Sequence, residues 1–190
     1  MANCQITSGL ALPCKNFMAG IRRIFVGNFF SGNTNIGQNV SYSTNATNQI
    51  TGMTVTTGGF YTFDLTKEAG EYVEAIHANA ANGTTSFEST LNIYLSQYST
   101  AVRNQMVLLA TTKLLIIYED RNGQYFLMGT DGTGTLTGTS NGVDMGESTA
   151  LTGKAYASDA NGYNLVFSAI EIVPPLEVEA SVIPSVILPA

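Results

Sequence analysis

The chain has 190 residues, enough for one domain with its own hydrophobic core, and its length requires no second domain. Only 12% of the residues are charged, about half the usual share, and Asn, Thr, Ser and Gly replace them. The net charge is −6 and there is no basic stripe, which argues against a groove that grips nucleic-acid phosphates. A weakly charged polar surface instead suits a subunit that packs against its own copies.

The negative charge is unevenly placed along the chain. Residues 124–190 hold seven acidic residues and one basic residue, Lys154, so the whole net charge arises there. An acidic surface repels DNA, which suits a conduit and not a binder. Simple solubility explains the same charge, and we favour that explanation.

Alternation of apolar and polar residues predicts strands in the first half of the chain. The first strand is expected at 20–30, and a stretch rich in Ser, Asn and Gly follows at 31–48. We interpret 31–58 as a long loop that a partner could order, although 49–57 alternates like a strand. Asn82-Gly83 is a hairpin-turn signal. Further strands on either side of this turn are predicted at 60–66, 71–79 and 84–95.

Helical spacing replaces this alternation once. Val102, Met106 and Leu109 share one face of a predicted helix over about 99–111, and Ser99 can cap its start. Strands are again predicted beyond the helix, at 114–118, 124–129, 133–137, 150–157 and 163–173. The sequence therefore predicts a mainly β domain at 1–175 with one flanking α-helix.

The last fifteen residues are apolar but interrupted by proline. Pro174-Pro175 ends the last predicted strand, and Pro184 and Pro189 lie further on. We interpret 176–190 as an extended C-terminal arm, which either folds back or lies on a neighbouring subunit.

No catalytic or metal-ligating set can be assembled from the residues. His77 is the only histidine and lies in an alternating strand, and the two cysteines, Cys4 and Cys14, are too few for a zinc site or a disulfide scaffold. We favour free thiols over a local disulfide. Asp144 and Glu147 lie in a Gly-rich stretch that would not fix their separation, as general acid–base catalysis requires. We therefore expect no enzyme, no metal and no cofactor.

The sequence also bears on location. Residues 1–15 lack a basic start and a signal core, and no stretch reaches the ~20 apolar residues of a membrane span. We expect the protein to be made and kept in a cytoplasm until something releases it.

Three stretches carry a resemblance to a known group of proteins. They read NCQITSGLALPCKNFMAGIRRIFVGNF, FESTLNIYLSQYSTAVRNQMVLLATTKLLIIYEDRNGQYFLMG and GKAYASDANGYNLVFSAIEIVPP. The chain resembles tail-tube-like structural proteins of bacteriophages, especially phages that infect Bacteroidetes. The resemblance covers most of the chain except the 31–58 loop and the final arm, and its motifs are turn and strand patterns.

The resemblance implies a β-sandwich or half-open barrel of tail-tube type. Such subunits form rings, commonly hexameric, that stack into a hollow tube through which genomic DNA passes without specific binding. It further implies a virion protein that is assembled in the host cytoplasm and whose partners are its own copies and other tail or neck proteins.

Composition and predicted shape suggest where such contacts would lie. On this interpretation the long loop reaches a neighbouring ring and the arm contacts an adjacent subunit. The predicted interface residues are Asn33, Asn35, Asn39 and Tyr42 in the loop, and Leu176, Val178, Val182, Ile183, Val186 and Ile187 in the arm.

Two other functions compete with a tail tube. A neck, connector or capsid-decoration protein would share the same features. A host-binding adhesin would share the Asn, Thr and Gly content, but the chain has no Trp and no calcium loop, which adhesins commonly use.

Overall fold

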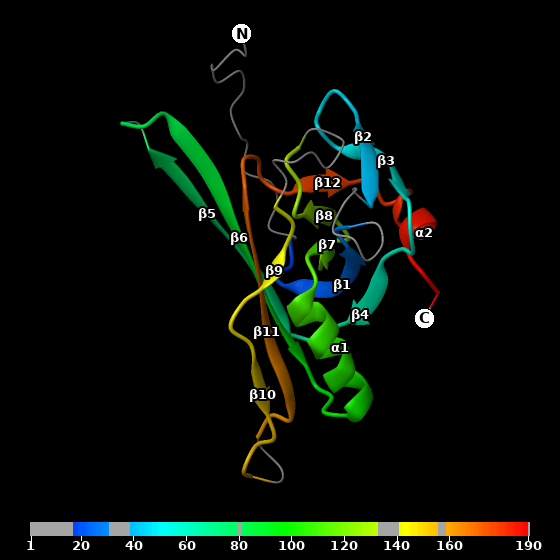
Figure 1. Cartoon of the computed structure of the whole chain (residues 1–190), viewed down its shortest axis with the longest axis vertical. Helices are drawn as coiled ribbons and strands as arrows, with labels where there is room; N and C mark the ends of the chain where they lie inside the picture. The colour runs from blue at the N-terminus through cyan, green and yellow to red at the C-terminus, as the bar shows by residue number, and fades with distance from the viewer. Residues whose placement is uncertain (1–16, 31–38, 80, 133–140, 156–158, 190) are drawn as a thin grey trace.

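The computed structural model describes residues 17–30, 39–79, 81–132, 141–155 and 159–189. As the sequence predicts, the fold is mainly β, with two sheets packed against each other and a helix at their flank (Figure 1). The sheets do not close into a barrel, so the arrangement is sandwich-like.

The larger sheet has seven strands. Along the sheet they are β2 (Val40–Thr44), β3 (Ile50–Val55), β12 (Leu176–Val178), β8 (Tyr125–Met128), β7 (Leu114–Asp120), β1 (Ile21–Asn28) and β4 (Tyr61–Asp64). All neighbours in this sheet are antiparallel except β12 and β3, which pair in parallel through Val178 and Ile50. The edges are therefore β2 and β4.

The second sheet is built on two long strands. Its order is β10 (Thr149–Leu151), β11 (Gly162–Glu171), β6 (Thr84–Leu95) and β5 (Gly70–Asn79), and β9 (Asp144–Met145) also pairs with β11. Strands β5 and β6 form one hairpin whose register runs from Gly70 opposite Ile93 to Asn79 opposite Thr84. The strand predicted at 133–137 lies outside the described residues.

Strand β7 explains why the two sheets meet where they do. Its run Leu114–Tyr118 is buried throughout, and alternate residues serve two separate cores. Leu114, Ile116 and Tyr118 face the second sheet, whereas Leu115 and Ile117 face the opposite side. A strand without polar alternation is stable only where both faces are covered, so each side of the larger sheet needs its own cover.

The predicted helix is confirmed as α1 (Thr100–Thr111). The hydroxyl of Ser99 accepts a hydrogen bond from the Val102 backbone N–H at 3.3 Å, which is the expected cap. Met106 and Leu109 are buried against the first core, which lies between the sheets. The helix thus covers the end of that core.

The prediction of a loop over 31–58 is wrong for its described part, residues 39–58, although the strand-like alternation noted at 49–57 is confirmed as β3. These residues form the β2–β3 hairpin, and Val40, Tyr42 and Ile50 are buried in the second core. The Ser and Thr residues that suggested a loop occupy the outward positions of the two strands. The polar composition therefore hid a short apolar alternation.

The prediction of an extended conformation over 176–190 is also wrong for the described residues, and of the two alternatives for this segment the structure shows the one in which it folds back. Strand β12 joins the larger sheet, and a short helix, α2 (Ile183–Val186), contains Pro184 in its first turn, where proline is tolerated. Phe60 donates its backbone N–H to the Val186 carbonyl at 2.9 Å, and Leu188 donates to the Phe60 carbonyl at 3.0 Å. The segment is the cover of the second core, so it belongs to the same domain.

This packing predicts that the C-terminal segment stabilises the monomer. Replacing the buried Ile183 with Ala should lower the free energy of unfolding by about 2–5 kcal/mol, because it removes methyl groups from a packed core. The matched change Ile172→Ala, at a residue that is 59% exposed, should alter it by less than about 0.5 kcal/mol. Denaturant unfolding of both variants checks this, and equal effects would mean that the segment does not pack as described.

Candidate assembly surface

The predicted interface residues do not form a free surface. Six of them are buried within the protein itself, and they are Asn39, Tyr42, Val178, Val182, Ile183 and Val186. Leu176 and Ile187 are partly buried and pack on the same second core. Asn33 and Asn35 lie outside the described residues. The described part of this prediction is wrong, because the apolar residues complete the protein's own core.

Asn39 shows why a polar residue can be committed to the fold. Its side-chain oxygen accepts from the Thr57 backbone N–H at 2.8 Å, and its amide group donates to the Asn28 and Thr57 carbonyls. The side chain therefore ties both ends of the β2–β3 hairpin to β1. A sequence pattern gives no sign of such a network.

A different element carries the exposed surface. The β5–β6 hairpin extends away from the two cores and ends in a turn well clear of them (Figure 1). Its root is core, since Leu91 is fully buried and Ile93 nearly so. Beyond the root, every described residue from 75 to 85 is exposed, and Ile76, opposite Phe87, is 64% exposed. A two-stranded ribbon is marginally stable in water on its own, so this end is suited to a partner.

The outer edge of this hairpin is open. Among the described residues, β5 pairs only with β6, so the N–H and C=O groups along its other side have no strand beside them. Proteins commonly protect such edges with lysine, proline or very short strands. Strand β5 is ten residues long and contains neither lysine nor proline. The opposite edge of the sheet is carried by the short β9 and β10.

The face of the sheet that points away from the cores is exposed as well. Val73 of β5 and Ile170 of β11 lie on this face and are 50% and 60% exposed. Its polar residues pair with each other, for example Asn92 with Glu71 at 3.0 Å and His77 with Glu88 at 3.0 Å. The strands β5, β6, β9, β10 and β11 contain five acidic residues and no Lys or Arg. The sheet is therefore a purely anionic element.

Two buried carboxylates, Glu171 and Glu119, lie one on each sheet. Glu171, at the end of β11, accepts hydrogen bonds from the Gly129 and Thr130 backbone N–H groups at 2.6 and 2.8 Å, and from the Ser89 hydroxyl at 3.2 Å. Burial raises the pKa of Glu171 from 4.5 to about 7, despite these donors. On the larger sheet, Glu119 is held by Arg22 at 3.0 Å and Arg23 at 2.6 Å, which offsets the cost of burying that charge.

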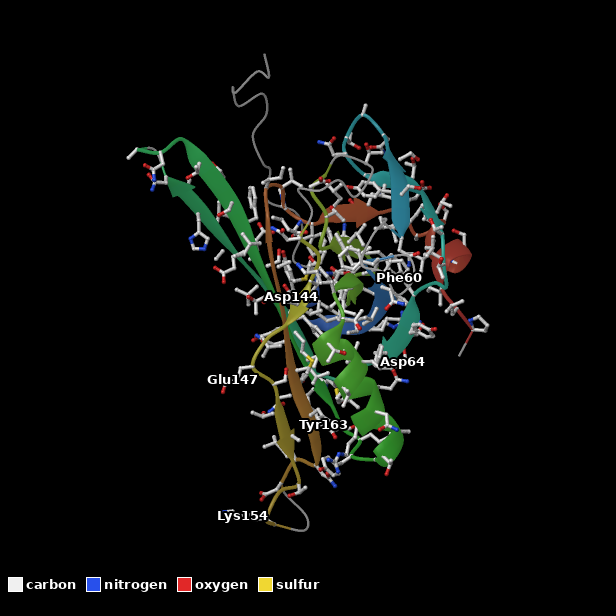
Figure 2. All side chains as sticks on the ribbon, viewed as in Figure 1. Phe60, Asp64, Asp144, Glu147, Lys154 and Tyr163 are labelled. Atoms are coloured by element: carbon white, nitrogen blue, oxygen red, sulfur yellow. The ribbon has the colours of Figure 1, made fainter. Side chains whose placement is uncertain are left out.

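The residues considered for chemistry are not brought together. Asp144 and Glu147 are both exposed (they are labelled in Figure 2), and the Asp144 carboxylate pairs weakly with Lys113 at 4.0 Å. His77 is on the exposed face of the hairpin. Within the described residues, no three His, Cys, Asp or Glu side chains are grouped as a metal would require.

A scan against protein-family models and searches of curated proteins and of solved structures found no match. No helix of the described part of the chain is long and apolar enough to span a membrane. The candidate surface thus stands on its geometry.

The hairpin strands were predicted from the sequence, but their role was not. One signal was present: between Ile76 and Phe87 no large apolar residue occurs, so this part of the ribbon has nothing to place in a core. What the sequence could not show is that β5 ends its sheet.

This division between root and end of the hairpin is testable. Ile76→Ser should change the free energy of unfolding by less than about 0.5 kcal/mol, since the side chain is largely exposed. Leu91→Ala, fifteen residues further along the same hairpin, should lower it by about 2–5 kcal/mol. Urea unfolding measures both, and a large loss for Ile76→Ser would mean that the end of the hairpin is part of the core.

Proposed function

We propose that this protein is a structural subunit of a phage tail tube, which assembles with its own copies into stacked rings that form a conduit for DNA. The single observation that carries the proposal is the long β5–β6 hairpin, whose open edge and exposed face are not needed for the protein's own core. The resemblance of three sequence stretches to tail-tube-like proteins supports the same function.

The two edges of the second sheet suggest how copies join. The open β5 edge of one copy would add to the β9 and β10 edge of the next, so that backbone hydrogen bonds continue from subunit to subunit. Such a head-to-tail contact closes into a ring when the rotation between copies permits it, and closure leaves no free edge. A homo-hexamer is the ring that the resemblance implies.

The charge of the sheet supports a conduit. If the exposed face of β5, β6 and β11 lines the lumen, it offers Glu71 and Glu88 and no Lys or Arg to a passing duplex. DNA phosphates would find no cation on these strands, so the nucleic acid would move without being held. On this proposal the protein belongs to the virion and is assembled in the host cytoplasm.

The described contacts change where neighbouring rings would meet. The β2–β3 hairpin and the C-terminal segment are committed to the second core, so they leave little apolar surface for a neighbour. The exposed end of the β5–β6 hairpin takes over this role in the proposal, since it extends away from the cores (Figure 1).

Electron microscopy of the purified full chain tests the proposal. Rings or stacked tubes are the expected result, with an assembled fraction that grows with protein concentration. Rings that never stack would favour a neck or connector protein instead. A monomer that persists at all concentrations, in sedimentation and in images, would contradict self-assembly.

A matched pair of variants tests the surface itself. Val73→Lys places a charge on the exposed face of the edge strand, and should abolish rings or tubes while leaving the unfolding transition unchanged. Val107→Lys makes the same change on the outer face of α1, where the side chain is 62% exposed, and should leave assembly intact. If both variants assemble like the original chain, β5 is not the interface.

A further inference from the structure

A chain of four polar side chains crosses the root of the β5–β6 hairpin on the side that faces the core. Glu171 Oε2 lies 3.2 Å from the Ser89 hydroxyl oxygen, which lies 2.9 Å from the Tyr72 hydroxyl oxygen. The Tyr72 oxygen lies in turn 2.9 Å from Glu74 Oε2. Three strands, β11, β6 and β5, contribute to the chain, and Ser89 is fully buried.

This row of four side chains is one proton short when both carboxylates are ionised. Three oxygen–oxygen contacts need three protons to become hydrogen bonds, but the Ser89 and Tyr72 hydroxyls supply one each. With two protons, one contact remains a close approach of oxygen lone pairs inside the protein. A third proton on a carboxylate completes the chain, because Glu171 can then donate to Ser89, Ser89 to Tyr72, and Tyr72 to Glu74.

We propose that Glu171, Ser89, Tyr72 and Glu74 form a site that binds one exchangeable proton, held on Glu171 Oε2, and that this proton fastens the root of the hairpin. The geometry selects that atom in two steps. Glu171 is the buried carboxylate of the two, whereas Glu74 is partly exposed, and Glu171 Oε1 already accepts from the Gly129 and Thr130 N–H groups. Among the described residues, Oε2 contacts the Ser89 hydroxyl.

The surroundings favour the proton-bound form. Burial is the main cause that raises the pKa of Glu171 to about 7, and the negative charge of Glu74 adds to it. The titratable groups around the chain are Tyr72 and Glu74 on β5, Tyr118 on β7, and Asp131 just beyond Thr130. Burial also raises the pKa of Tyr72 and of Tyr118, which stacks on Tyr72 at 4.6 Å, so both phenols keep their protons.

The position of the site gives the proton a structural effect. Glu171 joins the loop after β8, on the larger sheet, to β6 on the second sheet. Loss of the proton breaks one hydrogen bond and leaves two carboxylates on one short polar chain. Because the pKa of Glu171 is higher in the folded protein than its ordinary 4.5, the folded state gains stability as the proton binds and loses it as pH rises through about 7.

Infrared difference spectroscopy of the full chain tests this site, since a protonated carboxyl group has a C=O band distinct from that of a carboxylate. The original protein should lose one such band between about pH 6 and pH 8, with a midpoint near 7. Glu171→Gln should lack the band, and its fold should persist because the Gln amide donates to Ser89 while its oxygen accepts from both backbone N–H groups.

Two further variants keep the test decisive. Glu74→Gln removes the like charge and should lower the midpoint by roughly half a pH unit or more. Glu71→Gln, at the exposed glutamate on the other face of β5, should leave the midpoint unchanged. A midpoint near the ordinary 4.5 in the original protein, or a band that survives Glu171→Gln in a folded chain, would overturn the proposal.

The site does not depend on the proposed function. The same spectra can be recorded from monomers and from assemblies, so a missing band leaves the tail-tube proposal untouched. Conversely, a monomeric protein that shows the band would contradict self-assembly and support the proton site.

Discussion

The structure depends on the burial of one strand from both sides. Strand β7 has no polar face along Leu114–Tyr118, so it is stable only between two apolar layers. The second sheet and α1 supply one layer, and the β2–β3 hairpin with the C-terminal segment supplies the other. This requirement fixes which parts of the chain are free to meet a neighbour, because whatever covers β7 cannot also cover another copy.

Strong periodicity made much of the fold predictable from the sequence. Alternation over 84–95 located β6 at both ends, and the spacing of Val102, Met106 and Leu109 with a Ser cap located α1. Prediction failed where a tertiary contact overrides local composition. Val40 and Tyr42 are isolated among polar residues, and the proline-containing C-terminus is ordered by its contacts with Phe60 and with the larger sheet.

The candidate surface was less predictable than the fold, for a physical reason. Whether a strand lies at an edge depends on the whole sheet, and no residue of β5 indicates that its outer side is unpaired. The proton site is harder still to foresee, since Ser89 and Glu171 are 82 residues apart in sequence and meet only when β6 and β11 pair. The composition predicts a surface suited to packing, but we assigned that surface to 31–58 and 176–190, whose described residues pack on the protein's own core.

The separation of the hairpin into a packed root and an exposed end has an evolutionary consequence. The described residues between 75 and 85 contribute no buried side chain, so substitutions and length changes there carry little thermodynamic penalty. Natural selection on this stretch would act on its contacts with a partner and very little on the stability of the fold. Chains that share this architecture can therefore diverge fastest at this exposed end of the hairpin. If that end is the assembly surface that we propose, two such chains could become incompatible partners while both remain well folded.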